Sequence, residues 1–146
     1  MTDVHDQKTR SYNMSQIKGK NTKPEMLVRR FLFSKGFRYR LHVKNLPGKP
    51  DIVLPKYETV IFINGCFWHG HENCKYYVIP KTRTDWWIEK INNTKYRDSI
   101  AIKELIQLGW IVKVIWTCEI RNNEFNSLND LITELGSSFS DKQNKQ

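Results

Sequence analysis

The stretch that decides the fold is Thr59-Val60-Ile61-Phe62-Ile63-Asn64-Gly65-Cys66-Phe67-Trp68-His69-Gly70-His71. Its first five residues are β-branched or aromatic, which predicts a strand in the centre of a sheet. The run breaks at Gly65 and is followed by a thiol, two imidazoles and two large aromatic rings. Aromatic rings beside metal-type ligands cost solubility if they only cover a surface. The stretch therefore predicts a buried strand that leads into a functional site.

Periodic patterns on both sides of this strand predict an α/β domain with a mixed central sheet covered by helices. Thr22, Pro24 and Glu25 have the spacing of an N-cap, an early helical proline and the acid of a capping box. The long loop at 64–83 is expected to have a function or internal ties. The expected elements are helices at 22–35, 84–108 and 125–135 and strands at 37–43, 51–54, 59–63 and 110–116.

The long helix at 84–108 is expected to begin with Thr84 as its N-cap and to end at Gly109. Apolar side chains at helical spacing predict which of its residues enter the core. These core candidates are Ile88, Ile91, Ile102, Leu105 and Ile106.

A length of 146 residues fits a single domain. We expect a basic N-terminal arm at 1–21, the domain proper at 22–136 and a polar, disordered tail at 137–146. The net charge is +9, and residues 1–50 carry twelve Lys and Arg against three acids. This one-sided charge favours nucleic acid as the partner over a merely solvated basic surface.

The N-terminal residues lack the apolar core of a signal peptide, and no apolar run approaches membrane-spanning length. Three cysteines are an odd number, which does not suit a disulfide framework and favours metal binding. We therefore expect an intracellular, cytoplasmic protein that does not engage a membrane.

Every cysteine of the chain can join one imidazole in a single metal site, formed by Cys66, His71, Cys74 and Cys118. Three thiolates and one imidazole fill a tetrahedral Zn²⁺ site, and such a fully protein-ligated site is structural. The alternative is that Cys118 is only a small buried hydrophobe. We favour zinc, which leaves His69 available for chemistry.

A second site is expected where Asp51 opens one strand and Ile63 ends the next, beside Asn64 and His69. Mg²⁺ takes few protein ligands, mostly carboxylates, and His69 is suited to general-base work. The strand at 59–63 offers no acid-x-Lys pair of the PD-(D/E)xK nucleases. The competing interpretations are that Asp51 only begins a strand after Pro50 and that Glu25 only completes a capping box.

Several motifs together resemble the very-short-patch repair (Vsr) DNA mismatch endonucleases. They are Arg10-Ser11, Met14, Thr22 with Glu25, Leu46-Pro47-Gly48-Lys49-Pro50-Asp51, the Gly65-Cys66-Phe67-Trp68-His69-Gly70-His71 run, Thr82-Arg83-Thr84 and Leu108-Gly109-Trp110. The resemblance implies a restriction-endonuclease-like fold. It also implies nicking on the 5′ side of the thymine in a T·G mismatch, the product of 5-methylcytosine deamination.

The resemblance also implies roles for single residues. The central Mg²⁺ carboxylate falls on Asp51, a backbone carbonyl ligand falls on Ile63, and two Mg²⁺ ions are implied. Glu25 corresponds to an acid that acts on the metals through water, and His69 to the general base. Asn64 departs from the family pattern, which often has a histidine at this position. Asparagine cannot shuttle a proton, so it cannot assist the leaving group as a histidine could. The zinc ligands fall on the four residues named above.

Aromatic and basic residues are candidates for DNA contacts. Insertion of an apolar ring costs least at a mismatch, and Phe67, Trp68 and Trp87 are the expected rings. Met14 resembles a minor-groove insertion of this family. Lys90, Thr94 and Asp98 share a helix face that can read bases or can simply be solvated. Phosphate contacts are expected from Arg10, Lys18 and Lys20, with Lys8 and Lys23.

The sequence therefore predicts a zinc-stabilised, Mg²⁺-dependent nicking endonuclease that acts on double-stranded DNA as a monomer. Mismatch-repair proteins are implied as partners by the resemblance alone. Two alternatives stay open: a restriction-type nuclease that cuts matched DNA, and a non-catalytic zinc module in which Asp51 only caps a turn.

Overall fold

The computed structural model describes residues 22–123 and 125–144. The basic arm at 1–21 lies outside the described residues, and with it Arg10, Met14, Lys18 and Lys20. No helix within the described residues is long and apolar enough to cross a membrane.

Within the described residues, four strands form one mixed sheet in the order β1-β2-β3-β4. β1 (Arg40–Leu41), β2 (Ile52–Leu54) and β3 (Thr59–Asn64) are antiparallel neighbours. β4 (Ile111–Trp116) runs parallel to β3 and is reached through the long helix α3 (Thr84–Gln107), which makes a β-α-β crossover. The predicted mixed sheet with covering helices is confirmed.

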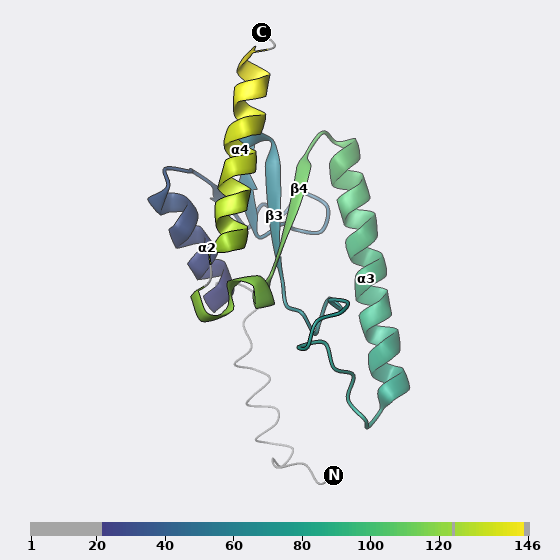
Figure 1. The fold of residues 1–146 in the computed structure, drawn as a ribbon. Helices are drawn as coiled ribbons and strands as arrows, with labels where there is room; N and C mark the ends of the chain where they lie inside the picture. Colours follow the sequence, from purple (N-terminus) through teal and green to yellow (C-terminus); the bar gives the residue numbers. More distant parts are fainter. Residues whose placement is uncertain (1–21, 124, 145–146) are drawn as a thin grey trace.

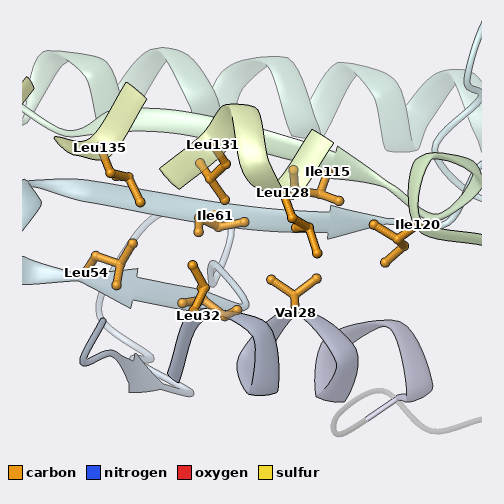
Figure 2. Packing of buried hydrophobic residues seen from close by; sticks show 10 residues of the cluster. Val28, Leu32, Leu54, Ile61, Ile115, Ile120, Leu128, Leu131 and Leu135 are labelled. Carbon is orange, nitrogen blue, oxygen red and sulfur yellow. The ribbon is translucent and has the colours of Figure 1, made fainter. Parts of the chain in front are cut away.

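Helices α2 (Lys23–Ser34) and α4 (Asn126–Asn144) pack on one face of the sheet, and α3 packs on the other (Figure 1). The strands alternate between these faces, as a period of two requires. Ile52, Leu54 and Ile61 join the core beneath α2 and α4, whereas Val53 and Val60 join Leu105 of α3. Figure 2 shows the larger core, in which Val28 and Leu32 point toward Leu54, Ile61 and Leu128.

The prediction of a strand at 37–43 is wrong in the length of the strand, because only Arg40 and Leu41 pair with β2. His42 has a φ of +56°, a left-handed conformation that ends the ladder. Phe37 precedes the strand and packs with Tyr57 at a ring-centroid distance of 5.1 Å.

The start of α3 also differs from the expectation. Arg83 occupies the cap position with a φ of +54° and makes no side-chain capping bond. Thr84 is the first helical residue, and its hydroxyl donates to the carbonyl oxygen of Pro80 at 2.9 Å. Thr84 therefore ties the preceding loop to the helix instead of capping it.

The core prediction for α3 is right for Ile91 and Leu105, which are buried, and wrong for two others. Ile88 and Ile106 are 41% and 59% exposed. Ile106 lies about 100° around the helix axis from Leu105, on the side that faces solvent. Ala101 takes the close-packed position instead.

Helix α4 extends to Asn144, beyond the end expected near residue 135 and into the segment expected as a disordered tail. A single interior glycine, Gly136, costs about 1 kcal/mol and does not by itself end a helix. Its core residues Leu128, Leu131 and Leu135 are buried as predicted.

Candidate active site and metal centre

A cavity of about 580 Å³ lies where the end of β3, the start of α2, the turn before β2 and the middle of α3 meet. All four residues predicted from the sequence to act in catalysis line it, as do three of those predicted to contact DNA. Its lining includes Glu25, Asp51, Ile63, Asn64, Trp68, His69, Thr94 and Asp98.

The turn before β2 fixes Asp51 at this cavity. Gly48 has a φ of +71°, and a Cβ there would lie 2.7 Å from the Cβ of Ala101 on α3. Only glycine allows this close approach, which anchors the turn against the helix. The backbone N–H of Asp51 then donates to the carbonyl of Ile61 at 3.1 Å. Its carboxylate accepts a bond of 2.7 Å from the backbone N–H of Ile63.

The environment of Asp51 raises the pKa of its carboxyl group above the ordinary value. Burial is the main cause and raises the pKa of Asp51 to about 6, helped by the nearby negative charge of Glu25. The bond from Ile63 and the electrostatic interactions with His69 and Arg29 act in the opposite direction. A buried carboxylate in these surroundings is stabilised by a bound cation, as expected of a metal ligand.

Glu25 is buried and belongs to the first turn of α2. The Thr22 side chain accepts a hydrogen bond from the backbone N–H of Glu25 at 3.4 Å. Thr22 is therefore the N-cap of α2, as predicted. The Glu25 carboxylate forms an ion pair with Nη2 of Arg29 at 3.0 Å. Its burial and its place in the cavity wall give Glu25 a setting that a capping box alone does not explain.

His69 has a partner that the sequence did not predict. Its Nδ1 lies 2.6 Å from Oδ2 of Asp98 on α3. The side chains of His69 and Asp98 are 28% and 34% exposed, so both can be reached from the cavity. Asp98 was nominated as a base reader from its helical spacing with Lys90 and Thr94. Its separation of 29 residues from His69 leaves no local signal for this pair.

The other two residues of that helix face have different surroundings. Thr94 lines the cavity and donates its hydroxyl proton to the carbonyl of Lys90 at 3.1 Å. The Lys90 ammonium lies over the ring of Trp86, 5.3 Å from its centroid. The predicted common face is therefore divided between the cavity and an aromatic surface.

The loop after β3 is tightly wound around Gly70, which has a φ of +61°. The backbone N–H groups of His69 and His71 donate to the carbonyls of Gly65 and Cys66 at 3.1 and 2.9 Å. A Cβ at Gly70 would lie 2.8 Å from the side chain of Ile91, so the loop is pressed onto α3. This winding places His69 at the cavity and His71 in a second cluster.

The second cluster brings together Cys66, His71, Cys74 and Cys118, whose ligand atoms all lie within 4.8 Å of one another. Cys118 Sγ is 3.5 Å from His71 Nδ1, close to the spacing of about 3.5 Å between two ligands of tetrahedral zinc. The ring of His71 stacks on Trp116 at 4.1 Å, which fixes its orientation.

The electrostatics of the cluster also suit a cation. Burial and the neighbouring thiols Cys66 and Cys74 raise the pKa of Cys118 to about 12. Burial also acts to raise the pKa of Cys66, but hydrogen bonds from Thr117, the Cys118 backbone and His71 outweigh it and lower that pKa to about 7. Three thiolates this close repel one another unless a metal ion lies between them. The donor set is therefore one that can hold a metal ion.

Three aromatic rings that the sequence nominated for DNA contact pack against one another. Phe67 lies 5.2 Å from Trp68 and 5.4 Å from Trp87, and the two tryptophans are 5.8 Å apart. Trp68 is 40% exposed and also lines the cavity of Asp51. Packing among the rings holds Trp68 at the surface, next to the candidate active site.

Comparison with known proteins identifies the family of this chain. The family model described as DNA mismatch endonuclease Vsr matches residues 2–75. The chain is 50% identical to the type II nicking enzyme V.NmeAIP of Neisseria meningitidis serogroup A, over 92% of this chain and 97% of that protein.

Two further relatives agree. The type II nicking enzyme V.XorIIP of Xanthomonas oryzae is 48% identical over 82% of this chain and 88% of its own. The DNA mismatch endonuclease Vsr of Escherichia coli K12 is 43% identical over 85% of this chain and 79% of its own. Because these relatives are enzymes that cut DNA, the alternative of a non-catalytic zinc module is wrong. The chain belongs to the Vsr family of DNA mismatch endonucleases, which are DNA-cleaving hydrolases.

Proposed function

We propose that this protein is a Mg²⁺-dependent endonuclease that nicks double-stranded DNA on the 5′ side of the thymine in T·G mismatches. In very-short-patch repair, this cut would begin the removal of thymines formed by deamination of 5-methylcytosine. The observation that carries the proposal is the single cavity lined by Glu25, Asp51, Asn64 and His69.

The donors around Asp51 fit a magnesium site. Asp51 and the backbone carbonyl of Ile63 would hold one Mg²⁺, and Glu25 would act on the metals through water. When bound, Mg²⁺ neutralises charge on the scissile phosphate and on the leaving oxygen. The raised pKa of Asp51, about 6, supports this assignment because it records a buried carboxylate with too little positive charge around it.

His69 is proposed as the general base that takes a proton from the attacking water. The Asp98 carboxylate accepts a hydrogen bond from the Nδ1–H of the imidazole, so the neutral ring keeps its lone pair on Nε2. Asp98 would also stabilise the imidazolium that forms after proton transfer. Asn64 is buried at the end of β3 and lines the cavity, where its amide can donate to a phosphate oxygen but cannot carry a proton.

We propose that the mismatch is recognised by ring insertion. Phe67, Trp68 and Trp87 form a preassembled aromatic wedge beside the cavity. Unstacking costs a few kcal/mol and least at a mismatched pair, so the wedge itself favours T·G over matched DNA. Met14 would insert into the minor groove, Lys90 and Thr94 would lie near the bases, and Arg10, Lys18 and Lys20 would contact phosphates.

The fold family, the chain segments, the zinc site and the partners are also proposals. The sheet and its crossover helix would form a restriction-endonuclease-like core at 22–136, with the basic arm at 1–21 before it and the last turns of α4 after it. The Cys66, His71, Cys74 and Cys118 cluster would hold a structural Zn²⁺ that keeps the loop after β3 rigid. The protein would act as a monomer, and mismatch-repair proteins would be its partners in the cytoplasm.

A cleavage assay tests the proposal directly. An end-labelled duplex with one T·G mismatch and its matched C·G and T·A versions are incubated with wild type and with Asp51→Ala, with and without Mg²⁺. We expect nicking of the T·G duplex alone, only with Mg²⁺ and only by the wild type. Equal cutting of the matched duplexes would favour a restriction-type nuclease instead.

Replacement of Asp98 by asparagine should lower kcat on the T·G duplex by about 10²- to 10⁴-fold, the usual contribution of general-base catalysis. The amide can donate to Nδ1 and so favours the tautomer whose Nε2 carries the proton. Single-turnover rates measure the effect, and binding to the duplex should change little. In the presence of His69→Ala the same replacement should cost almost nothing, and an undiminished additional loss would contradict the proposed pair.

A further inference from the structure

Arg29 is a charged side chain buried in the domain. It is 6% exposed and lies on α2, one helical turn after Glu25. Its Nη2 forms the 3.0 Å ion pair with Glu25, and both side chains are only 7% exposed. A second nitrogen, Nη1, lies 3.2 Å from the sulfur of Met26.

Stability alone does not account for this pair. Removal of two charges from water costs about as much as their attraction returns, so a buried ion pair is weak evidence for a stabilising role. By contrast, removal of one partner leaves an uncompensated buried charge and is strongly destabilising. The position of the pair in the fold is therefore the better guide to its role.

The surroundings of the pair indicate what it serves. Glu25 lines the cavity of about 580 Å³ and also an adjoining hollow of about 390 Å³, and Asp51 lines both. Among the described residues that line these two spaces, Arg29 is absent. Arg29 therefore contacts Glu25 without facing the space that substrate would occupy.

Two carboxylates at one cavity repel each other, so a cation beside either of them lowers the energy of the arrangement. The planar fork of a guanidinium holds a carboxylate in a defined orientation better than a point charge does. We infer that Arg29 is a positioning residue, whose guanidinium holds the Glu25 carboxylate at the cavity wall beside Asp51. The inference rests on the proposed function, in which Glu25 acts in cleavage.

A double-mutant cycle tests the inference. Steady-state nicking is measured at saturating Mg²⁺ for wild type, Arg29→Met, Glu25→Gln and the double variant, on whichever duplex the wild type nicks fastest. Arg29→Met should lower kcat by about 10- to 100-fold, because small displacements of a reacting group have effects of this size. The KM for DNA should stay within about threefold, since Arg29 does not face the substrate. In the Glu25→Gln background the same change should cost less than about threefold.

Arg30→Met is the matched control, because Arg30 is the next residue of α2, is exposed, and lines a different groove beside Phe31. It removes the same charge from the same helix and should leave kcat within about threefold of wild type. Circular dichroism and thermal unfolding verify that each variant is folded at the assay temperature. If Arg29→Met does not fold, Arg29→Lys replaces it in both backgrounds, since it keeps the charge and loses the fork.

Equal losses of kcat in the wild-type and Glu25→Gln backgrounds would overturn the inference, as would a folded Arg29→Met variant with full kcat. A wild type that nicks only matched DNA would instead refute the proposed T·G function, and the cycle would still be read on that duplex.

Discussion

Replacement of Asp51 by asparagine is expected to abolish nicking and, without Mg²⁺, to stabilise the folded protein. The rate should fall by about 10³-fold or more, because the loss of a metal ligand removes several kcal/mol of transition-state stabilisation. The gain in stability follows from the pKa of Asp51, which burial raises from 3.8 to about 6 in the folded protein.

The direction of the stability change follows from proton linkage. A carboxyl whose pKa is higher in the folded state contributes its full stability below pH 3.8, and this contribution is lost as the pH rises to about 6. At pH 7 the charged side chain thus costs the metal-free fold roughly 1–3 kcal/mol, which asparagine would restore. The asparagine side chain can still accept the backbone N–H of Ile63.

Denaturant unfolding of wild type and Asp51→Asn at pH 7 and pH 4.5, with and without Mg²⁺, measures these changes. The advantage of the variant should shrink at pH 4.5 and should also shrink with Mg²⁺, which stabilises only the wild type. Nicking at low Mg²⁺ should decline as the pH falls through about 6, because protons then compete with the metal for Asp51. A variant that is less stable than wild type at pH 7 without Mg²⁺ would contradict this description of the site.

Replacement of His71 by alanine should unfold the protein, whereas the same change at His69 should leave it folded and inactive. The two imidazoles lie two residues apart in one loop, yet His71 belongs to the cysteine cluster and His69 to the cavity. Loss of a structural metal site is expected to cost more than about 4 kcal/mol, which approaches the whole free energy of unfolding of a domain of low stability, about 5 kcal/mol.

Metal analysis and thermal unfolding of the two variants make the comparison. The His69→Ala protein should retain one zinc per chain and a melting temperature near that of wild type. The His71→Ala protein should lack zinc, and chelation of zinc from the wild type should have the same effect. A His71→Ala protein that has lost its zinc but melts at the wild-type temperature would contradict a structural role for the cluster.

Local motifs made parts of both candidate sites predictable from sequence. The Cys66, His71 and Cys74 spacing and the strand that ends before Cys118 were enough to predict that three thiols and one imidazole come together. Asp51 and His69 followed from the ends of two strands that had to be neighbours. Such predictions succeed because adjacent residues and adjacent strands stay adjacent in the fold.

Contacts made across the crossover helix were not predictable in the same way. Asp98 meets His69 only because α3 packs at the end of β3, and nothing in the spacing of α3 distinguishes this contact from a solvated position. The length of β1 was missed because the left-handed conformation of His42 is not visible in an alternating apolar pattern. Arg29 was overlooked because an arginine four residues after a glutamate is normally an exposed helical pair.

We propose above that the residues lining one cavity, among them Glu25, Asp51 and His69, cut one DNA strand beside a T·G mismatch. The most direct measurement is the position of the cut, mapped at nucleotide resolution on a duplex labelled on either strand, with Mg²⁺ present. We expect one nick, in the thymine strand, immediately 5′ of the mismatched thymine, and no product with Asp51→Ala. Cuts in both strands, a cut at the same site in matched DNA, or cutting that survives Asp51→Ala would contradict it.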